Sequence, residues 1–150
     1  IFIIIMNFFN QLFLGDSGSY SLSFLIGVIL INTYNLNPEI TPYFIILLLW
    51  YPCFENLFSI FRKIISRKDP LKPDNEHLHY LLYTFLRQKL NISRLKSNNF
   101  SSISINLFNL IIFYISSLNI YHTGYQLNII LFSTIFYFFI FYILKKNSKP

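Results

Sequence analysis

The sequence has 150 residues, of which 54% are hydrophobic, 20% aromatic and only 12% charged. A soluble globular domain has about a quarter of its residues charged, so this composition excludes an ordinary water-soluble domain. The formal net charge is +6, and nine of the twelve Lys and Arg fall between Arg62 and Lys96, with the rest in the C-terminal tail. This distribution is typical of basic cytoplasmic loops in a membrane protein, and we expect no nucleic-acid partner.

Residues 1–14 are mostly apolar, but they do not start with Met and have no basic residue before them and no small-residue cleavage site after them. These features argue against a signal peptide. We expect this stretch to be the inner end of an earlier membrane helix, and the chain to be the C-terminal part of a longer protein. The single cysteine, Cys53, predicts that the chain forms no internal disulfide.

Four segments are apolar enough to cross a bilayer, whose core takes about 20 helical residues. These segments are residues 20–34, 40–61, 103–121 and 127–144. Neither the connection between the first two nor the one between the last two contains Lys or Arg. The sequence therefore predicts one all-α domain, a transmembrane bundle with about four spanning helices. Residues 62–102 form its cytoplasmic loop, both termini are cytoplasmic, and the two short connections lie outside.

Polar residues interrupt two of the predicted spans. Pro52 is expected to kink the second span, because neighbouring helices can satisfy the carbonyl that a proline frees. Glu55 is either a functional acid at membrane depth or a hydrated residue at the interface, and the sequence leaves both interpretations open. Four polar residues of the third span are expected to form interhelical hydrogen bonds. They are Asn106, Asn109, Ser116 and Ser117.

The first cluster with chemical potential is FLGDSGS, residues 13–19, which places Asp16 between glycines directly before a span. Glycines let the backbone turn tightly near a ligand, and an Asp there can bind a Mg²⁺ ion that holds a diphosphate. A plain helix start capped by Asp16 or Ser17 is the alternative. GDSG also surrounds the nucleophilic serine of trypsin-like proteases, but the long apolar segments on both sides exclude that β-barrel class.

The second cluster is FRKIISRKDPLKPDNEHLHYLL, residues 61–82, in which His77 and His79 are two positions apart. Basic side chains and imidazoles at a membrane surface suit a diphosphate, because they provide both positive charge and directed N–H donors. A zinc site is the less favoured interpretation, since no third ligand is evident nearby. A solvated basic loop that contacts anionic lipid headgroups is another alternative.

Together, the GDSGS turn before a membrane helix and the loop RK…DPLKPDNEHLHYLL resemble the polyprenyl-phosphate sugar-1-phosphate transferases, the family of the bacterial WecA, TagO and MraY enzymes. The resemblance covers about residues 13–82. It implies that Asp16 acts with Mg²⁺ or Mn²⁺ at the site of phosphoryl transfer. It also implies that His77 and His79 are catalytic, and that four residues bind the nucleotide-sugar. These four are Ser19, Arg62, Lys63 and Asp74.

The chain departs from the family pattern at two positions, with Asn75 in place of an Arg and Tyr80 in place of a further His. The resemblance implies transfer of a sugar 1-phosphate, such as an N-acetylhexosamine 1-phosphate, from a UDP-sugar to undecaprenyl or another polyprenyl phosphate. UMP would be released. We expect this reaction at the cytoplasmic face of a bacterial inner membrane, in the synthesis of cell-wall, lipopolysaccharide or other envelope glycans.

The family also uses acidic motifs upstream, so we expect residues 1–150 alone to be inactive and to need the missing N-terminal half as a partner. Two other classes remain open. A transporter fragment would use Glu55 and the polar residues of the third span to line a path. A noncatalytic scaffold would use the basic loop to bind anionic lipid in the bilayer.

Overall fold

The computed structural model describes residues 6, 9, 11, 15–67, 69 and 76–147. Asp74 and most of residues 1–14 lie outside this set, so the predictions made for them stay predictions. The regular structure of the described residues is helical, without a strand, which confirms the predicted all-α class. In chain order the helices are α2 (Gly15–Leu36), α3 (Pro42–Leu48), α4 (Trp50–Ile65), α5 (Leu78–Gln88), α6 (Arg94–Ser117) and α7 (Thr123–Asn147).

Three of these helices, α2, α6 and α7, are long and apolar enough to cross a membrane. The pair α3 and α4 passes the same test together, but its two helices are bent by 79° at the break between them, so the pair is either a fourth, broken span or a re-entrant loop. The chain is therefore a multi-pass membrane protein. The prediction of about four spans agrees with the structure when the bent pair counts as one.

The bend in the second predicted span lies at Leu49, three residues before the proline that was expected to cause it. The N–H of Leu49 closes α3 on the carbonyls of Ile46 and Leu47, and α4 begins at Trp50. Pro52 then lies in the first turn of α4, where helical N–H groups have no intrahelical acceptor and a proline loses nothing. The proline is thus accommodated by the new helix start and does not kink a continuous helix.

The predicted loop of residues 62–102 is also largely helical. It contains the end of α4, the whole of α5 and the beginning of α6, which starts at Arg94 and not at the predicted residue 103. Polar residues such as Ser97 and Ser101 fit into this early part of α6 because both are buried against neighbouring elements. Because the first residues of α6 are polar, hydropathy alone did not predict that the helix begins before residue 103.

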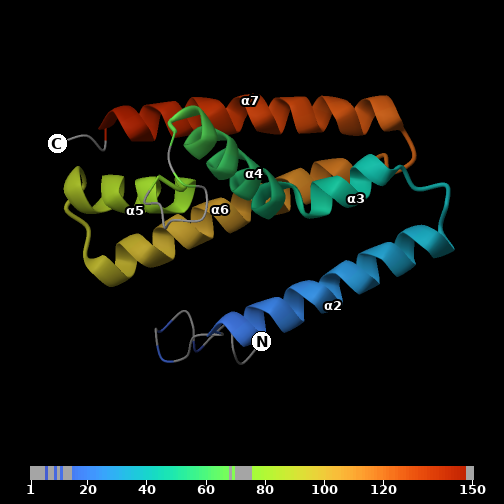
Figure 1. Ribbon diagram of the computed structural model, residues 1–150, viewed down its shortest axis with the longest axis horizontal. Helices are drawn as coiled ribbons and strands as arrows, with labels where there is room; N and C mark the ends of the chain where they lie inside the picture. The colour runs from blue at the N-terminus through green and yellow to red at the C-terminus, as the bar shows by residue number, and fades with distance from the viewer. Residues whose placement is uncertain are drawn as a thin grey trace.

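The core forms where α3, α4, α5, α6 and α7 meet, and its centre is aromatic. Figure 1 shows α7 running alongside α5 and α6, with α3 and α4 crossing them. Trp50 is 3% exposed and stacks on Phe54, whose centroid lies 4.9 Å from that of Tyr137 in an edge-to-face contact. Such pairs add about 0.5–1.5 kcal/mol each beyond the area they bury. This packing fixes the position of α4 relative to α7.

In contrast, α2 buries none of its residues and packs mainly against α3. Most of its side chains are exposed, including Phe24 at 75% and Ile31 at 63%. A helix that is apolar on all sides belongs in lipid or among other membrane helices. Helix α2 is therefore positioned by lipid or by other membrane helices as much as by the described core.

The two uncharged connections lie together at one end of the bundle, as predicted. The N–H of Thr41 donates to the carbonyl of Ile120 at 3.0 Å, and the hydroxyls of Thr123 and Thr41 are 3.4 Å apart. Because α2 is one continuous helix ending at the first connection, Gly15 and Asp16 belong to the opposite end. Figure 1 shows the start of α2 directed toward the end of the molecule that holds α5, the start of α6 and the end of α7.

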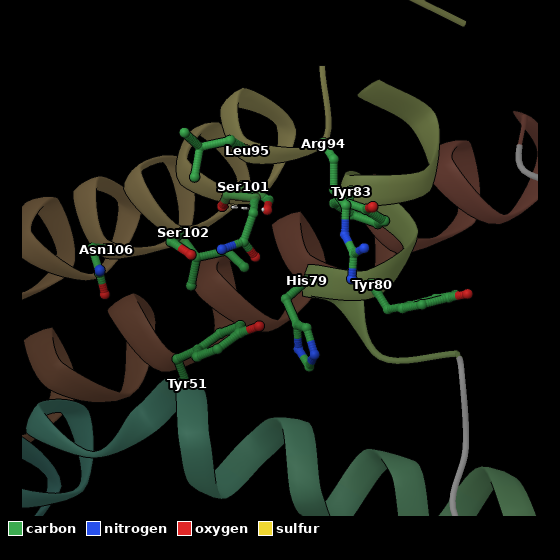
Figure 2. A pocket seen from close by; sticks show the side chains of 11 residues that line it. Tyr51, His79, Tyr80, Tyr83, Arg94, Leu95, Ser101, Ser102 and Asn106 are labelled. Carbon is green, nitrogen blue, oxygen red and sulfur yellow. Dashed lines mark hydrogen bonds between the residues drawn. The ribbon is translucent and has the colours of Figure 1, made fainter. Parts of the chain in front are cut away.

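The prediction for the polar residues of the third span is right for one of the four. Ser116 is fully buried, and its hydroxyl donates to Oε1 of Gln126 on α7 at 2.6 Å. Asn109 and Ser117 instead donate to backbone carbonyls of their own helix. Asn106 faces an open cavity between α5 and α6 (Figure 2).

Candidate functional site

A buried carboxylate on α4 is the centre of the polar site. Glu55 is 6% exposed, and its two oxygens contact three donor groups, two at the start of α5 and one on α7. Oε1 accepts from the backbone N–H of Leu78 at 2.9 Å and lies 3.1 Å from Nδ1 of His77. Oε2 accepts from the hydroxyl of Tyr137 on α7 at 2.7 Å. A buried charge requires such partners, and this arrangement supports the interpretation of Glu55 as a site residue over that of a hydrated one.

Glu55 also explains why α5 starts where it does. His77 occupies the residue before α5 in an extended conformation, but its side chain makes no capping bond. The carboxylate of Glu55 accepts the first free N–H of the helix instead, at Leu78. A negative charge at a helix N-terminus is favourable, because the helix dipole is positive there. The acid of α4 therefore caps α5 and fixes the position of the His77–His79 segment.

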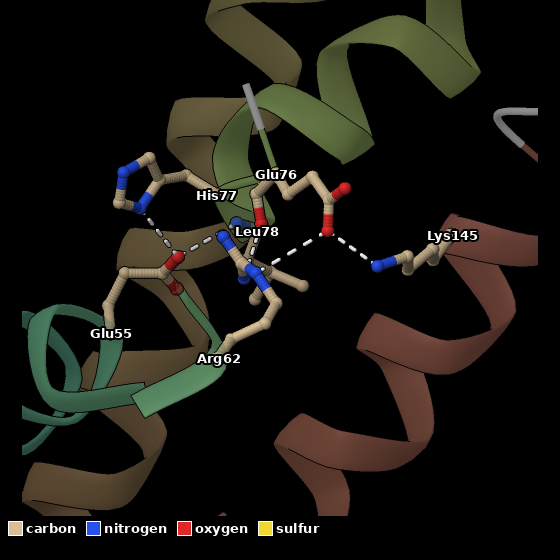
Figure 3. A network of polar contacts seen from close by, with 6 residues as sticks. All are labelled: Glu55, Arg62, Glu76, His77, Leu78 and Lys145. Atoms are coloured by element: carbon tan, nitrogen blue, oxygen red, sulfur yellow. Dashed lines mark hydrogen bonds and ion pairs between the residues drawn. The ribbon is translucent and has the colours of Figure 1, made fainter. Parts of the chain in front are cut away.

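The orientation of His77 follows from the same contact. Because carboxylate oxygens accept, Nδ1 is the nitrogen that donates to Glu55. Nε2 then points away from Glu55, as Figure 3 shows, and is the ring nitrogen left to contact a substrate. The ring of His77 stacks on that of His79, with a centroid distance of 5.6 Å and an interplanar angle of 14°. The two histidines form one unit at the start of α5.

A second polar group connects α4, the residue before His77 and the end of α7. The guanidinium of Arg62 donates to the carbonyl of Glu76 at 3.0 Å, and its Nε lies 3.4 Å from the Glu76 carboxylate. Lys145 forms an ion pair with the same carboxylate (Figure 3). Arg62 also lies over the rings of Phe58 and Phe141, 5.4 and 5.5 Å from their centroids. These contacts hold the histidine segment against α4 and α7.

His79 faces the other way, into a cavity of about 920 Å³ between α4, α5 and α6. Figure 2 shows its imidazole near Tyr51, with Arg94 and Tyr83 across the opening. Desolvation of the partly buried imidazole lowers the pKa of His79 below its ordinary value of 6.5, and the neighbouring His77 lowers this pKa further. Glu55 acts in the opposite direction, but its effect is smaller. A neutral imidazole here donates one N–H and accepts at its other nitrogen.

The remaining predicted site residues do not all converge on this centre. Lys63 is 9% exposed, one residue after Arg62. Asp16 is exposed at the start of α2, and its carboxylate forms no hydrogen bond or ion pair with another described residue. The hydroxyl of Ser19 donates to the carbonyl of Gly15 within the same helix at 2.8 Å. Asp74 is outside the described residues. Asp16 is thus at the predicted end of the bundle but not in contact with the histidines.

The magnesium expected from Asp16 requires several oxygen ligands. In the part of the chain that the structure describes, no group of three or more His, Cys, Asp or Glu is placed to hold a metal ion. One exposed carboxylate does not make such a site. The described residues therefore do not fit a magnesium ion by themselves, and no reaction step below is derived through one.

Several residues of the site were not predicted from the sequence. They are Tyr51, Glu76, Arg94, Tyr137 and Lys145. Tyr137 lies 82 positions from Glu55 within an aromatic span, where no pattern distinguishes it from its neighbours. Glu76 directly precedes His77, so the only available signal was an acid beside the histidine motif. The contacts of these residues depend on helix packing that single-sequence patterns do not contain.

The fold and site define a multi-pass helical membrane protein with a histidine pair, a buried carboxylate and cations at one end of its bundle. Known proteins with which the chain shares sequence make this class more specific. The chain is 31% identical over 78 residues to the probable undecaprenyl-phosphate N-acetylglucosaminyl 1-phosphate transferase of Bacillus subtilis. The matched region covers 50% of this chain and 21% of that protein. The chain is 34% identical over 71 residues to the undecaprenyl-phosphate alpha-N-acetylglucosaminyl 1-phosphate transferase of Thermotoga maritima, 47% of this chain and 23% of the relative.

The protein of Haemophilus influenzae with the same name as the Thermotoga relative is 27% identical over 73 residues, 48% of this chain and 21% of the relative. The resemblance to the polyprenyl-phosphate sugar-1-phosphate transferases is therefore confirmed over about half of the chain. The chain spans about a fifth of the length of these curated relatives. No family model and no solved structure matches it.

Proposed function

We propose that this chain is part of an enzyme that transfers N-acetylglucosamine 1-phosphate, or a related sugar 1-phosphate, from a UDP-sugar to undecaprenyl phosphate. A phosphate oxygen of the lipid attacks the β-phosphorus of the UDP-sugar. The bond between the β-phosphorus and the oxygen bridging to the α-phosphorus breaks, and UMP leaves. The product is a sugar joined to the lipid through a diphosphate.

The observation that carries this proposal is the position of the His77–His79 pair. Glu55 fixes the pair at the start of α5, and Arg62 and Lys145 lie beside the preceding residue. The names of the relatives supply the reaction class, and the site supplies residues whose chemistry suits phosphates. Phosphoryl transfer needs positioned donors and positive charge more than covalent catalysis by the protein.

Each residue then has a defined task. In its imidazolium form His77 has a hydrogen on both ring nitrogens, so Nε2 donates to a phosphate oxygen of the donor while Nδ1 donates to Glu55. Arg62 keeps the segment in register through Glu76 and contributes positive potential near the diphosphate. Asp16 lies at the same end of the bundle, and the resemblance of the GDSGS turn implies that it acts with a metal ion. In this proposal the described residues of this chain bind and orient the nucleotide-sugar.

The active end is proposed to face the cytoplasm of a bacterial cell. Basic residues lie at the end of α4, at the start of α6 and in the last turn of α7. A cluster of Lys and Arg at one side of the membrane is the signature of the cytoplasmic side. Nucleotide-sugars are made in the cytoplasm, so the donor and the histidine pair would meet on that side.

The direct test is detection of the product. Membranes containing the protein at its full natural length are incubated with UDP-N-acetylglucosamine, undecaprenyl phosphate and Mg²⁺, and the lipid fraction is analysed by mass spectrometry. We expect a new lipid whose mass exceeds that of undecaprenyl phosphate by one N-acetylglucosamine phosphate unit. A lipid that gains the sugar without the phosphate would indicate a different reaction, and no new lipid with any of several UDP-sugars would refute the proposal.

A further inference from the structure

Two cavities adjoin along α6 and differ in chemistry. The larger one, of about 920 Å³, is lined by Arg94, His79, tyrosines, serines and asparagines, and its lining includes no Asp or Glu. The smaller one, of about 380 Å³, is lined almost wholly by apolar side chains of α5, α6 and α7. Tyr51 and Ile105 belong to the lining of both cavities. A polar chamber therefore adjoins an apolar one.

The polar chamber has unused donors. Arg94 forms no hydrogen bond or ion pair with another described residue. The imidazole of His79 stacks on His77 but forms no hydrogen bond with a described residue. These groups suit an anion with several oxygens.

The apolar chamber indicates what else the ligand carries. It follows α6 from Ser104 to Ile111, deeper in the spanning part of the helix than the polar chamber. Arg94 and Ile111 are separated by about 26 Å along the helix axis, at a rise of about 1.5 Å per residue. A nucleotide-sugar has no group for the apolar chamber. A phosphate attached to a long hydrocarbon fits both.

We propose that these two cavities form the acceptor site, in which the phosphate of a polyprenyl phosphate binds Arg94 and His79 and its chain passes Tyr51 and Ile105 into the apolar chamber. This inference rests on the proposed function and adds to it the place of the lipid substrate. Because His77 and His79 stack face to face, a donor bound at His77 and an acceptor bound at His79 meet at the histidine pair.

The phosphate supplies most of the affinity. The polyprenyl chain of the ligand is already surrounded by hydrocarbon in a membrane. Moving it into the apolar chamber therefore improves packing but adds little hydrophobic free energy. The guanidinium of Arg94 provides charge-assisted hydrogen bonds that an amide cannot replace, so Arg94→Gln weakens binding about tenfold or more. Ile105→Trp fills the junction between the two chambers. It should weaken binding of the polyprenyl chain while the positive charge of Arg94 is kept.

The test is photolabelling of the full-length protein in lipid nanodiscs with a polyprenyl phosphate that carries a diazirine on its chain, followed by peptide mapping. We expect labelling of α6 between Ser104 and Ile111, reduced about tenfold by Arg94→Gln but not by Lys96→Gln, an exposed cation one half-turn away. Ile105→Trp should also reduce labelling, whereas Leu110→Trp, on the exposed side of α6, should not. Thermal unfolding of each variant shows whether it is folded, and a misfolded Arg94→Gln is replaced by Ile105→Trp as the deciding variant.

Competition identifies the occupant. Unlabelled polyprenyl phosphate should suppress the label, whereas polyprenol, phosphatidylglycerol and UDP-sugar should not. Equal competition by polyprenol or phosphatidylglycerol would mean an unselective lipid cavity, competition by UDP-sugar would assign the chamber to the donor, and even labelling around α6 would mean no site. Each of these outcomes overturns the inference. Labelling needs no turnover, so an active enzyme without site-specific labelling refutes the acceptor site alone, while a labelled but inactive enzyme refutes the proposed function alone.

Discussion

Glu55 Oε1 lies 3.1 Å from Nδ1 of His77, although the two residues are 22 positions apart and belong to different elements. The same oxygen caps α5, and the second carboxylate oxygen binds Tyr137 on α7. One side chain thus joins three helices and sets the direction of a histidine. This contact makes Glu55 a positioning residue for His77.

Replacing Glu55 by Gln should lower turnover by up to about 100-fold in the full-length enzyme. The amide keeps the size of the side chain but brings a donor against either Tyr137 or His77, so the imidazole shifts, and misplacement of about 1 Å can cost that much in rate. The measurement is kcat with saturating substrates. Glu39→Gln, an exposed acid in the connection at the other end of the bundle, is the matched control. Turnover of a folded Glu55→Gln variant equal to that of the control would contradict the positioning role.

Tyr137→Phe should destabilise the fold more than it impairs transfer. The change removes one hydrogen bond to a buried carboxylate, worth about 1.5–3 kcal/mol, while Leu78 and His77 still hold the other oxygen. Thermal unfolding in detergent measures the effect. Tyr142→Phe is the comparison, because Tyr142 is on the same helix and 70% exposed. If the two variants unfold at the same temperature, the Tyr137 contact contributes nothing.

The sequence was sufficient for the helical membrane class, the approximate spans and the two motifs, because these depend on local composition and spacing. It marked Glu55 as notable but left its role open. The break at Leu49 was not predictable from Pro52, since a proline tolerates both a kink and a helix start. Helix α5 was missed because its amphipathic residues lie within a charged loop, and its start depends on Glu55, which is distant in sequence.

Asp16→Asn should abolish transfer without preventing membrane insertion. The amide preserves shape but removes the charge that a hard divalent cation requires. Since Asp16 is exposed and forms no hydrogen bond or ion pair with another described residue, the substitution should leave the unfolding temperature unchanged. Turnover is measured across a range of Mg²⁺ concentrations, with Glu39→Gln again as control. Normal transfer by Asp16→Asn at every concentration would remove this acid from the mechanism.

His79 should titrate below 6.5 in the folded protein, because desolvation and the neighbouring His77 lower its pKa. Between the lowered pKa and 6.5 the unfolded chain binds the extra proton and the folded chain does not, so stability falls as pH decreases through this window. The contribution of the neutral imidazole is fully present above 6.5. Nitrogen chemical shifts of His79, assigned by loss of the signal in His79→Gln, give the midpoint. A midpoint at or above 6.5 would show that the imidazole is not desolvated.

The central claim is that the histidine pair held by Glu55 acts in sugar-phosphate transfer. The most direct measurement is UMP release by the full-length protein from UDP-N-acetylglucosamine with undecaprenyl phosphate and Mg²⁺, comparing wild type with His77→Ala, His79→Ala and His122→Ala. His122 lies in the connection at the opposite end of the bundle, where its Nδ1 accepts from the N–H of Tyr125. We predict lipid-dependent UMP release that falls at least about 100-fold in the first two variants and stays near the wild-type rate in the third. Equal rates in all four proteins would contradict the account.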